Sequence, residues 1–342
     1  MATQVNLVNL TKSDYRGAPS TLCQGCGHNS IASQIIAAAY ELNLVPEDVV
    51  KFSGIGCSSK SPTYFLSRSF GFNGLHGRMP ALATGAMFGD LSLKGVGVSG
   101  DGDSVSIGMG QFKHILRRNL DFVYIIENNG VYGLTKGQFS ATSEKGLKLK
   151  YQGVNQYMPI DICMEALIGG ASFVARSFAG DPKQVKELIK AAFAHKGLAV
   201  LDIISPCVTF NNADDSYHSY GWGKDHSAPL HDISYIPARD EIMIEGDFEP
   251  GTVKNVELHD GSTIILKKLD RDHDPLDRTK AIQVLDESYR QNQLLTGLIY
   301  VNPNQITLGE IHNLPETALN RIPTSKLRPS PESIAEVNRM MF

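Results

Sequence analysis

The chain has 342 residues, of which 42% are hydrophobic and 20% charged, and this composition is typical of a soluble globular protein of about two domains. The formal net charge of −4 does not favour nucleic acid or an anionic membrane surface as a partner. The first residues lack the basic and apolar segments of a secretory signal, and no apolar run of about 18 residues predicts a membrane span. Five cysteines in such a chain indicate a reducing, cytoplasmic compartment and metal ligation rather than disulfides.

The N-terminal region carries a paired-cysteine motif. Residues 1–22 predict an irregular arm, and Cys23 and Cys26 follow in a glycine-rich loop. Two cysteines at this spacing can direct both thiolates at one metal centre, and an intervening glycine breaks the pattern of covalent haem attachment. Apolar residues at helical spacing predict a helix over 30–44 directly after the loop. The N-terminus of that helix and His28 could face an anion, or His28 could serve only as a local cap.

A second motif follows the first predicted strand, 49–53. It places Cys57 on a glycine-rich turn at the carboxyl end of the strand, where ligands bind in open α/β sheets. The sequence then predicts a short helix over 62–69 and an Ala/Gly-rich helix over 81–91. A His-Gly-Arg segment at 76–78 lies between these two helices.

The central motif joins two apolar segments, 94–99 and 121–127, which are predicted as strands connected by a helix over about 105–118. The first strand leads into Gly-Asp-Gly-Asp at 100–103, and the second leads into Asn-Asn-Gly-Val-Tyr-Gly at 128–133. Gly102 and Asn128 are separated by the 25 residues 103–127, which is enough for one β–α–β excursion that returns to the same sheet edge.

This motif combines carboxylate, amide and carbonyl oxygens with glycines. Such hard oxygen donors suit Mg²⁺, which commonly shares its ligands with phosphates. Glycines let backbone N–H groups approach an anion, and a helix that begins near Ser104 favours negative charge at its start. The spacing therefore predicts a Mg²⁺–diphosphate site, with an ordinary strand–turn–helix as the alternative. Lys136, seven residues past Asn129, is a candidate for an anionic substrate or diphosphate group, or is a solvated loop residue.

The alternation of strands and helices continues to the fifth cysteine. Residues 140–160 predict an extended loop that is a lid or a subunit contact, and we interpret Cys163 as a small buried hydrophobe. Cys207 again lies just past the end of a strand. The pattern predicts a parallel sheet with both faces covered. The elements predicted here are a helix over 161–167, a strand over 171–177, a helix over 181–195 and a strand over 198–204.

Beyond residue 211 the sequence changes character. It predicts a hairpin over 253–258 and 263–269, a polar helix over about 275–293 and a Pro-rich end. We interpret 211–342 as a smaller appendage that wraps the main domain or contacts another chain. The expected organisation is therefore an arm (1–22), an α/β domain (23–210) and this appendage.

Four of the cysteines, all in predicted loops, form a possible ligand set: Cys23, Cys26, Cys57 and Cys207. Four thiolates suit either Zn²⁺ or a [4Fe–4S] cluster. Structural zinc sites more often show two paired motifs or a compact finger, which favours the cluster modestly. Cysteines with a purely structural role are the third interpretation.

The motifs together resemble a known family. Gly-Asp-Gly followed at this distance by Asn-Asn resembles the thiamine diphosphate fingerprint. The longer pattern G-D-G-D…N-N-G-V-Y-G-L-T-K-G-Q, with C-x-x-C-G-H, G-I-G-C-S and S-P-C, is similar to the β subunits of 2-oxoacid:ferredoxin oxidoreductases over roughly residues 20–225. The resemblance implies an α/β parallel-sheet fold, the pyrophosphate-binding domain of thiamine enzymes, with a smaller C-terminal appendage.

The resemblance also implies site residues. Mg²⁺ would be bound by Asp101, Asn129 and the carbonyl of Val131, and one [4Fe–4S] cluster by Cys23, Cys26, Cys57 and Cys207. For Arg78, the resemblance implies only a position beside the diphosphate. Lys136 is the candidate for contact with the substrate carboxylate. The expected cofactor-binding residues are Gly56, Ser58, His76, Gly77, Gly100, Asp101, Gly102, Asp103, Asn129, Val131, Gly133, Leu134 and Thr135.

The implied reaction is oxidative decarboxylation of a 2-oxoacid with coenzyme A and ferredoxin, giving acyl-CoA, CO₂ and reduced ferredoxin. Chain length and the appendage favour 2-oxoglutarate over pyruvate or branched-chain oxoacids, and a non-catalytic electron-transfer or zinc-stabilised scaffold subunit is the alternative of a different class. Thiamine enzymes need a Glu from a pyrimidine-binding domain, which this sequence lacks. The expected partners are therefore an α subunit that supplies this Glu, in an αβ or (αβ)₂ heteromer, and ferredoxin, which the appendage could contact.

Overall fold

The protein is built on one twisted eight-stranded sheet. The computed structural model describes residues 4–238, 253–268 and 273–341. The strands lie in the order β11-β15-β9-β10-β4-β3-β1-β2, and all neighbours are parallel except β15 and β9, which are antiparallel. The strands are β1 (Val49–Ser53), β2 (Phe70–Asn73), β3 (Lys94–Gly100), β4 (Phe122–Asn128), β9 (Phe173–Phe178), β10 (Leu198–Ile204), β11 (Ser227–Pro229) and β15 (Leu294–Val301).

The central strands are apolar throughout because both faces of the sheet are covered. Every residue of β4 and of β10 is buried, as is typical of parallel sheets with helices on both sides. Successive side chains point to opposite faces, so Val123 and Ile125 join one core cluster while Phe122, Tyr124 and Ile126 join another.

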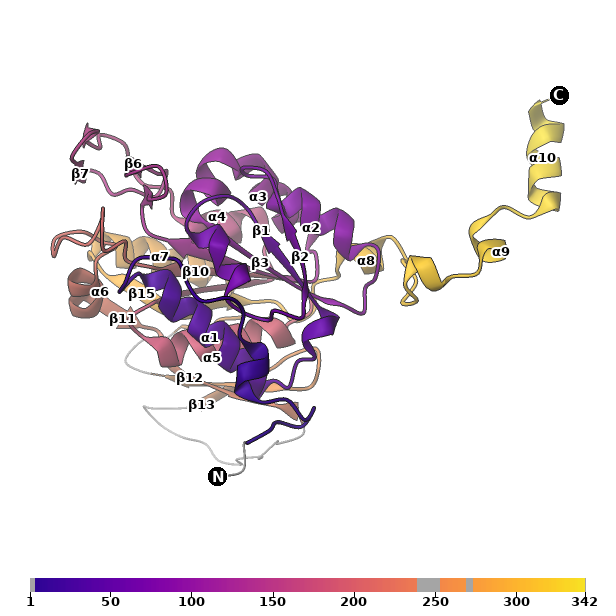
Figure 1. The fold of residues 1–342 in the computed structure, drawn as a ribbon, viewed down its shortest axis with the longest axis horizontal. Coiled ribbons are helices and arrows are strands. Elements are labelled where there is room, and N and C mark those ends of the chain that lie inside the picture. The colour runs from indigo at the N-terminus through magenta and orange to yellow at the C-terminus, as the bar shows by residue number, and fades with distance from the viewer. Residues whose placement is uncertain (1–3, 239–252, 269–272, 342) are drawn as a thin grey trace.

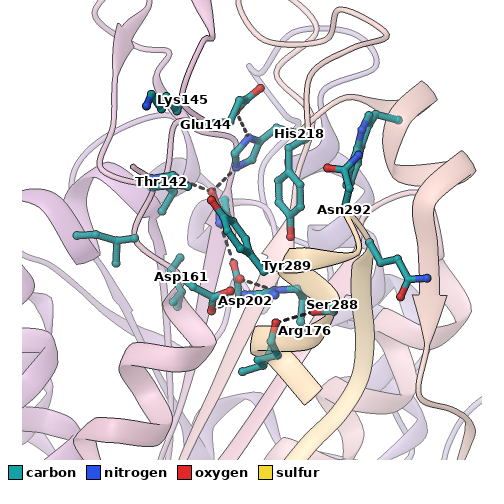
Figure 2. A pocket seen from close by; sticks show the side chains of 18 of the residues that line it. Thr142, Glu144, Lys145, Asp161, Arg176, Asp202, His218, Ser288, Tyr289 and Asn292 are labelled. Carbon is teal, nitrogen blue, oxygen red and sulfur yellow. Dashed lines mark hydrogen bonds and ion pairs between the residues drawn. The ribbon is translucent and has the colours of Figure 1, made fainter. Parts of the chain in front are cut away.

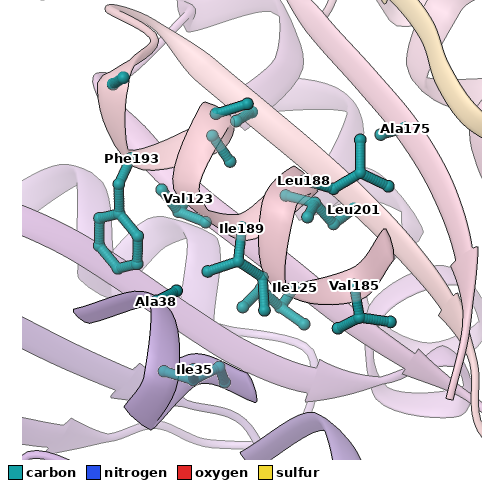
Figure 3. Close-up of a cluster of buried hydrophobic side chains, with 14 of the residues drawn as sticks. Ile35, Ala38, Val123, Ile125, Ala175, Val185, Leu188, Ile189, Phe193 and Leu201 are labelled. Atoms are coloured by element: carbon teal, nitrogen blue, oxygen red, sulfur yellow. The ribbon is translucent and has the colours of Figure 1, made fainter. Parts of the chain in front are cut away.

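The first face is covered by two helices, α1 (Gly27–Glu41) and α5 (Pro182–Ala194). Ile35 and Ala38 of α1 and Leu188 of α5 pack with Val123 and Ile125 of the sheet (Figure 3). A small antiparallel sheet adds to the same cluster below α5. Its strands are β12 (His231–Ile236), β13 (Val253–Glu257) and β14 (Thr263–Lys268), in the order β12-β14-β13.

The second face is covered by four helices whose apolar side chains form the other cluster. They are α2 (Met79–Met87), α3 (Met109–Arg118), α4 (Ile162–Gly169) and α7 (Arg278–Arg290). Cys163 on α4 is fully buried in this cluster, in agreement with its interpretation as a small hydrophobe. The mostly parallel, doubly covered sheet confirms the predicted α/β fold class.

The local predictions held where apolar periodicity was strong. The five strands predicted up to residue 204 are β1, β3, β4, β9 and β10, and the hairpin is β13–β14, although its last predicted residue, 269, lies outside the described residues. The short helix expected over 62–69 was wrong. A 3₁₀ helix, η3 (Ser58–Thr63), ends near the start of this region. The residues that follow pair with the N-terminal arm instead: Phe65 forms a β-bridge with Arg16, and the N–H of Leu66 donates to the Tyr15 carbonyl. The helix expected over 105–118 is α3 preceded by a wider turn, η4 (Gly102–Ile107).

The segment 211–342 is tied to the main sheet more closely than an appendage. It supplies β11 and β15, and all eight residues of β15 are buried. That strand is a continuous apolar run, Leu-Leu-Thr-Gly-Leu-Ile-Tyr-Val, which the sequence analysis missed. The main sheet therefore contains strands from both sides of residue 211.

Shorter elements complete the described chain. Beyond β15 the chain runs away from the body to α10 (Figure 1). No helix in the described ranges is both long and apolar enough to cross a lipid bilayer. The remaining elements are η1 (Lys12–Tyr15), η2 (Pro46–Asp48), β5 (Val131–Tyr132), β6 (Gln138–Phe139), β7 (Lys148–Leu149), β8 (Gly153–Val154), α6 (Tyr220–His226), α8 (Leu308–Ile311), η6 (Leu319–Arg321), α9 (Thr324–Leu327) and α10 (Pro331–Met341).

A buried histidine lies where α5 ends. His195 Nε2 is 2.7 Å from the hydroxyl of Ser172, which donates to Asn119. Its other ring nitrogen, Nδ1, is buried without a hydrogen-bond partner. A proton on Nδ1 would place a charged donor away from water, and burial accordingly lowers the pKa of His195 to about 3.

This histidine predicts a loss of stability in acid. Below about pH 6.5 the unfolded chain binds a proton that the folded chain rejects, so each such histidine lowers the free energy of unfolding by about 1.4 kcal/mol per pH unit. We expect His195→Leu to reduce this slope by about that amount between pH 6.0 and 5.0, measured by urea unfolding. His114→Leu, at an exposed site on α3, is the matched control and should keep the wild-type slope. Equal slopes for all three proteins would contradict the prediction.

Candidate cofactor site

The carboxyl ends of four neighbouring strands meet at one edge of the sheet. In the order β10-β4-β3-β1, these ends are followed by Cys207, Asn129, Asp101 and Cys57. The main-chain N–H of Asn129 donates to Asp101 Oδ1 at 3.3 Å. The structure therefore brings together the carboxylate and the amide that sequence spacing had placed at one site.

A small cavity of about 70 Å³ lies at this edge and gathers the predicted cofactor residues. His28, Ile55, Cys57, Ile107 and Tyr132 also line it. Gly77 is absent from the lining. The predicted residues along the cavity are Gly56, Ser58, His76, Gly100, Asp101, Gly102, Asp103, Asn129, Val131, Gly133, Leu134 and Thr135.

Gly77 lies beside the cavity through a contact with Asp103. Its N–H donates to Asp103 Oδ1 at 2.8 Å, and the Ser99 hydroxyl donates to Oδ2 at 2.7 Å. Asp103 is buried. Its carboxylate therefore ties the His-Gly-Arg segment to the end of β3 and positions the neighbouring His76 at the cavity. Arg78 is exposed and begins α2.

Asn129 is fixed by two contacts at the end of β4. Its Oδ1 accepts from the N–H of Val131 at 3.0 Å, and its Nδ2 lies 3.4 Å from His28 Nε2. Nε2 therefore accepts, and the proton of a neutral His28 sits on Nδ1, which is 2.6 Å from the Ser205 hydroxyl. Burial lowers the pKa of His28 to about 4, in keeping with a neutral ring.

An acidic group lies beneath His28. Glu127 is fully buried, its carboxyl is 3.3 Å from His28 Nδ1, and the hydroxyl of Ser61 donates to it at 3.0 Å. Burial raises the pKa of Glu127 well above its ordinary value. The floor of the site is thus a set of buried, mutually bonded polar groups, which is the arrangement that a low-dielectric site requires.

Two loops clamp the turn that follows β4. Gly130 adopts φ of +71°, and a Cβ there would lie 2.8 Å from His218 Nδ1 and 2.9 Å from Asn211 Nδ2, so this position requires glycine. Asn211 Nδ2 donates to the Asn129 carbonyl at 3.0 Å, and the Ser143 hydroxyl donates to the Gly130 carbonyl. The sequence analysis missed Ser143 and Asn211, which lie 13 and 82 positions from the residues that they contact.

A second, larger cavity of about 440 Å³ is lined by side chains that include Thr142, Asp202 and His218 (Figure 2). Asn128 and Thr142 form its wall toward Asp101, since Thr142 Oγ1 is 2.7 Å from Asp101 Oδ2 and 2.9 Å from Asn128 Oδ1. Deeper in the cavity, the guanidinium of Arg176 pairs with Asp161 at 2.7 Å and with Asp202 at 2.9 Å. Asn128 Nδ2 donates to Asp202 at 3.0 Å within this larger cavity, and the hydrogen bond from Thr142 to Asp101 links it to the smaller one.

Two of the four loop cysteines lie beside Gly133. A Cβ on Gly133 would lie 3.6 Å from Cys207 Sγ and 3.8 Å from Cys57 Sγ. Burial, with smaller contributions from Glu127, Cys207 and Cys57, raises the pKa of Cys26 to about 12. Burial and then Cys207 and Cys23 also raise the pKa of Cys57. These cysteines are therefore near enough for their charges to act on one another.

Two observations limit what the structure says about the metal ligands and Lys136. Over the described residues, no set of three or more His, Cys, Asp or Glu side chains is arranged to hold one metal ion. Lys136 is exposed, with φ of +77°, and does not line either cavity. The ligand sets for Mg²⁺ and for a cluster, and the role of Lys136, therefore stay predictions.

Comparison with known proteins agrees with this geometry. Residues 54–203 match the family model described as thiamine pyrophosphate enzyme, C-terminal TPP binding domain. The chain is 44% identical over 191 residues to the 2-oxoacid:ferredoxin oxidoreductase subunit beta of Saccharolobus solfataricus, covering 56% of this chain and 63% of the relative. It is 38% identical over 195 residues to the 2-oxoglutarate synthase subunit KorB of Methanocaldococcus jannaschii, covering 56% of this chain and 71% of that relative.

The chain belongs to the β subunits of the 2-oxoacid:ferredoxin oxidoreductases. A solved structure of 2-oxoglutarate:ferredoxin oxidoreductase from Magnetococcus marinus, with 2-oxoglutarate, coenzyme A and succinyl-CoA bound, is also similar. It has a TM-score of 0.71 and 30% identity, and the match covers 94% of this subunit and 97% of that chain. The predicted family and fold are thereby confirmed. The matches to the first curated relatives cover 60–63% of their length, so the activity of the whole enzyme is argued separately below.

The contacts of Asp103 predict a structural role in this subunit. Asp103→Ala removes the acceptor of two buried donors, so we expect the free energy of unfolding to fall by about 2 kcal/mol. Asp90→Ala is the matched control, because Asp90 accepts only from Ser92 in an exposed turn, and it should cost less than about 1 kcal/mol. Urea unfolding of both variants measures the difference. Equal losses would show that the Asp103 contacts do not stabilise the fold.

Proposed function

We propose that this subunit binds thiamine diphosphate with Mg²⁺ and one [4Fe–4S] cluster, and forms half of an enzyme for oxidative decarboxylation of a 2-oxoacid. With coenzyme A and ferredoxin, the products are an acyl-CoA, CO₂ and reduced ferredoxin. One observation carries the proposal. The cavity lined by the diphosphate motif shares Cys57 and Gly133 with the cysteine group, so both cofactors would lie against the same turn.

The magnesium would be held by Asp101, Asn129 and the main-chain carbonyl of Val131. Asp101 and Asn129 are buried and joined by a hydrogen bond, and their oxygens have the hard character that Mg²⁺ selects. Val131 is held two residues on by the Asn129 side chain. The residue types at these three positions support the assignment.

The diphosphate would lie in the cavity between the ends of β1 and β3. A Cβ on Gly100 would be 2.7 Å from the Ser58 hydroxyl. Because glycine has no Cβ, there is space for this hydroxyl at the cavity wall. His76 lines the same cavity from the other side. Both residues can donate hydrogen bonds to phosphate oxygens.

The cluster would be held by Cys23, Cys26, Cys57 and Cys207. Bound thiamine diphosphate supplies the electron sink for decarboxylation, and a bound cluster accepts electrons one at a time. This subunit's own contribution is to hold both sites on one rigid sheet edge. Cys23 is exposed, so the cysteine group reaches the surface where an electron acceptor such as ferredoxin could approach.

A second subunit is part of the proposal. The matched family model covers only the C-terminal cofactor-binding domain of thiamine enzymes, and the relatives are named as β subunits. We infer that an α subunit supplies the Glu that activates the pyrimidine, together with contacts to coenzyme A, in an αβ or (αβ)₂ assembly. Residues 23–210 would form the cofactor- and cluster-binding domain behind the arm 1–22, and 211–342 would contribute to subunit or ferredoxin contact.

The favoured substrate is 2-oxoglutarate. Relatives named 2-oxoglutarate synthase and a solved structure with bound 2-oxoglutarate support it. Relatives named only for 2-oxoacids keep pyruvate and branched-chain oxoacids as candidates. A non-catalytic electron-transfer or zinc-stabilised scaffold role would be indicated by a preparation without iron, sulfide or thiamine.

Single cysteine variants test the cluster. The subunit, co-expressed with its α subunit and purified without oxygen, should contain iron and sulfide and absorb near about 400 nm. Cys57→Ala should remove that absorbance and most of the iron, because one ligand is lost. Cys163→Ala is the matched control, since this cysteine is buried among apolar side chains on α4, and should keep both. Retention of iron in Cys57→Ala, or zinc in place of iron in the wild type, would contradict the assignment.

Replacement of Lys136 tests the substrate. If its ammonium group meets the distal carboxylate of 2-oxoglutarate, Lys136→Ala should lower kcat/KM for 2-oxoglutarate by about tenfold or more and leave the value for pyruvate within about threefold. Steady-state assays of the assembled enzyme with both oxoacids measure this. Lys148→Ala, at another exposed lysine beyond the motif, is the control. Equal changes for the two substrates would remove this role.

A further inference from the structure

The hydroxyl of Thr142 lies between two acceptors. It is 2.7 Å from Asp101 Oδ2 and 2.9 Å from Asn128 Oδ1, and Thr142 is buried and lines the larger cavity (Figure 2). A hydroxyl has one proton, so it can donate to only one of them. The neighbours of Asn128 decide which acceptor receives the proton.

The side-chain amide of Asn128 is oriented by a hydrogen bond to Asp202. Its Nδ2 donates to Asp202 Oδ1 at 3.0 Å, which fixes its Oδ1 as the acceptor on the other side. His218 Nε2 lies 3.1 Å from that Oδ1 and therefore carries a proton. Asn128 Oδ1 is thus supplied by His218, and the proton of Thr142 is left for Asp101.

The two distances from the Thr142 hydroxyl agree with this assignment. Asp101 Oδ2, at 2.7 Å, is nearer than Asn128 Oδ1, at 2.9 Å, and a carboxylate oxygen is a stronger acceptor than an amide oxygen. The other ring nitrogen of His218, Nδ1, lies 3.1 Å from Glu144 Oε2, so the imidazole is held between Glu144 and Asn128.

We propose that Thr142 is a positioning residue for the magnesium ligand Asp101. Its hydroxyl proton holds Oδ2, while the main-chain N–H of Asn129 holds Oδ1, so each carboxylate oxygen keeps a lone pair for the cation. Groups that orient a metal ligand in this way change metal affinity by about 10- to 100-fold. The inference rests on the proposed function, because it assumes that Asp101 binds Mg²⁺.

This role places part of the 140–160 segment in the cofactor site. Thr142 lies 41 residues after Asp101, and the N–H of Ala141 is anchored by the Ser106 hydroxyl at 2.9 Å. Asn155 donates to the carbonyls of Ser143 and Glu144 at 2.9 and 3.1 Å. The segment is therefore held against η4 and against itself, which fixes the hydroxyl relative to Asp101.

The test measures magnesium binding directly. The subunit with its α subunit is titrated with Mg²⁺ in the presence of thiamine diphosphate by calorimetry. Thr142→Val, which keeps the shape but lacks the hydroxyl, should raise the Kd for Mg²⁺ by about tenfold or more, and Thr142→Ser should stay within about threefold of wild type. Thr84→Val is the matched control, because Thr84 Oγ1 donates to Pro80 O within α2, and it should bind as wild type.

A double variant separates positioning from general damage. If Thr142 acts through Asp101, Thr142→Val should have no further effect in an Asp101→Asn background, so the two changes should be non-additive. Melting of the cofactor-free variants shows whether the fold is intact. If Thr142→Val folds poorly, the smaller Thr142→Ala carries the same prediction.

The outcomes distinguish this inference from the proposed function. If Asp101→Ala abolishes Mg²⁺ binding while Thr142→Val binds as wild type, the proposed site stands and the inference is overturned. It is also overturned if Thr142→Ser is as weak as Thr142→Val, since the hydroxyl is then irrelevant. If Asp101→Ala binds Mg²⁺ and thiamine diphosphate as wild type does, the proposed magnesium site itself fails.

Discussion

The adjacency of β3 and β4 is the constraint on which the site depends. The two strands are parallel neighbours in register from Val96 and Val123 to Gly100 and Glu127, so the residues that follow them must emerge side by side. Asp101 and Asn129 consequently meet through a hydrogen bond without any specialised loop. A shift in this register would separate them, because successive positions of a strand point to opposite faces.

The polar groups at this edge of the sheet need hydrogen-bond partners because they are buried. Asp101, Asn129, His28 and Glu127 are all buried, and each would destabilise the fold if it lacked a partner. The structure supplies partners from distant segments, such as Ser205 for His28 and Ser61 for Glu127. The network therefore stabilises the fold and orders the site with the same contacts, as fully satisfied buried networks do.

The sequence revealed the groups that could be found by local patterns. Buried strands read as apolar runs, and the residues at their carboxyl ends, such as Asp101 and Cys57, could be placed together from topology alone. Thr142 and His218 could not, because a threonine in a polar loop and a histidine beyond residue 211 have no periodic or spacing signal. Their role arises only from tertiary contacts across 41 and 90 positions. β15 was missed for a different reason. A single apolar run after a helix carries no signal that shows which strand of the sheet it pairs with.

The turn at Gly133 lies between two of the loop cysteines. Cys57 and Cys207 follow β1 and β10, which flank the β3–β4 pair on either side, so their sulfurs approach each other only across the segment that leaves β4. Gly133 lies at that crossing, and a methyl group there would make ordinary contacts of 3.6 and 3.8 Å with the two sulfurs. An alanine would therefore fit the protein, but it would occupy the space between the thiols. If the proposed cluster is bound, the bare glycine leaves this space open for it.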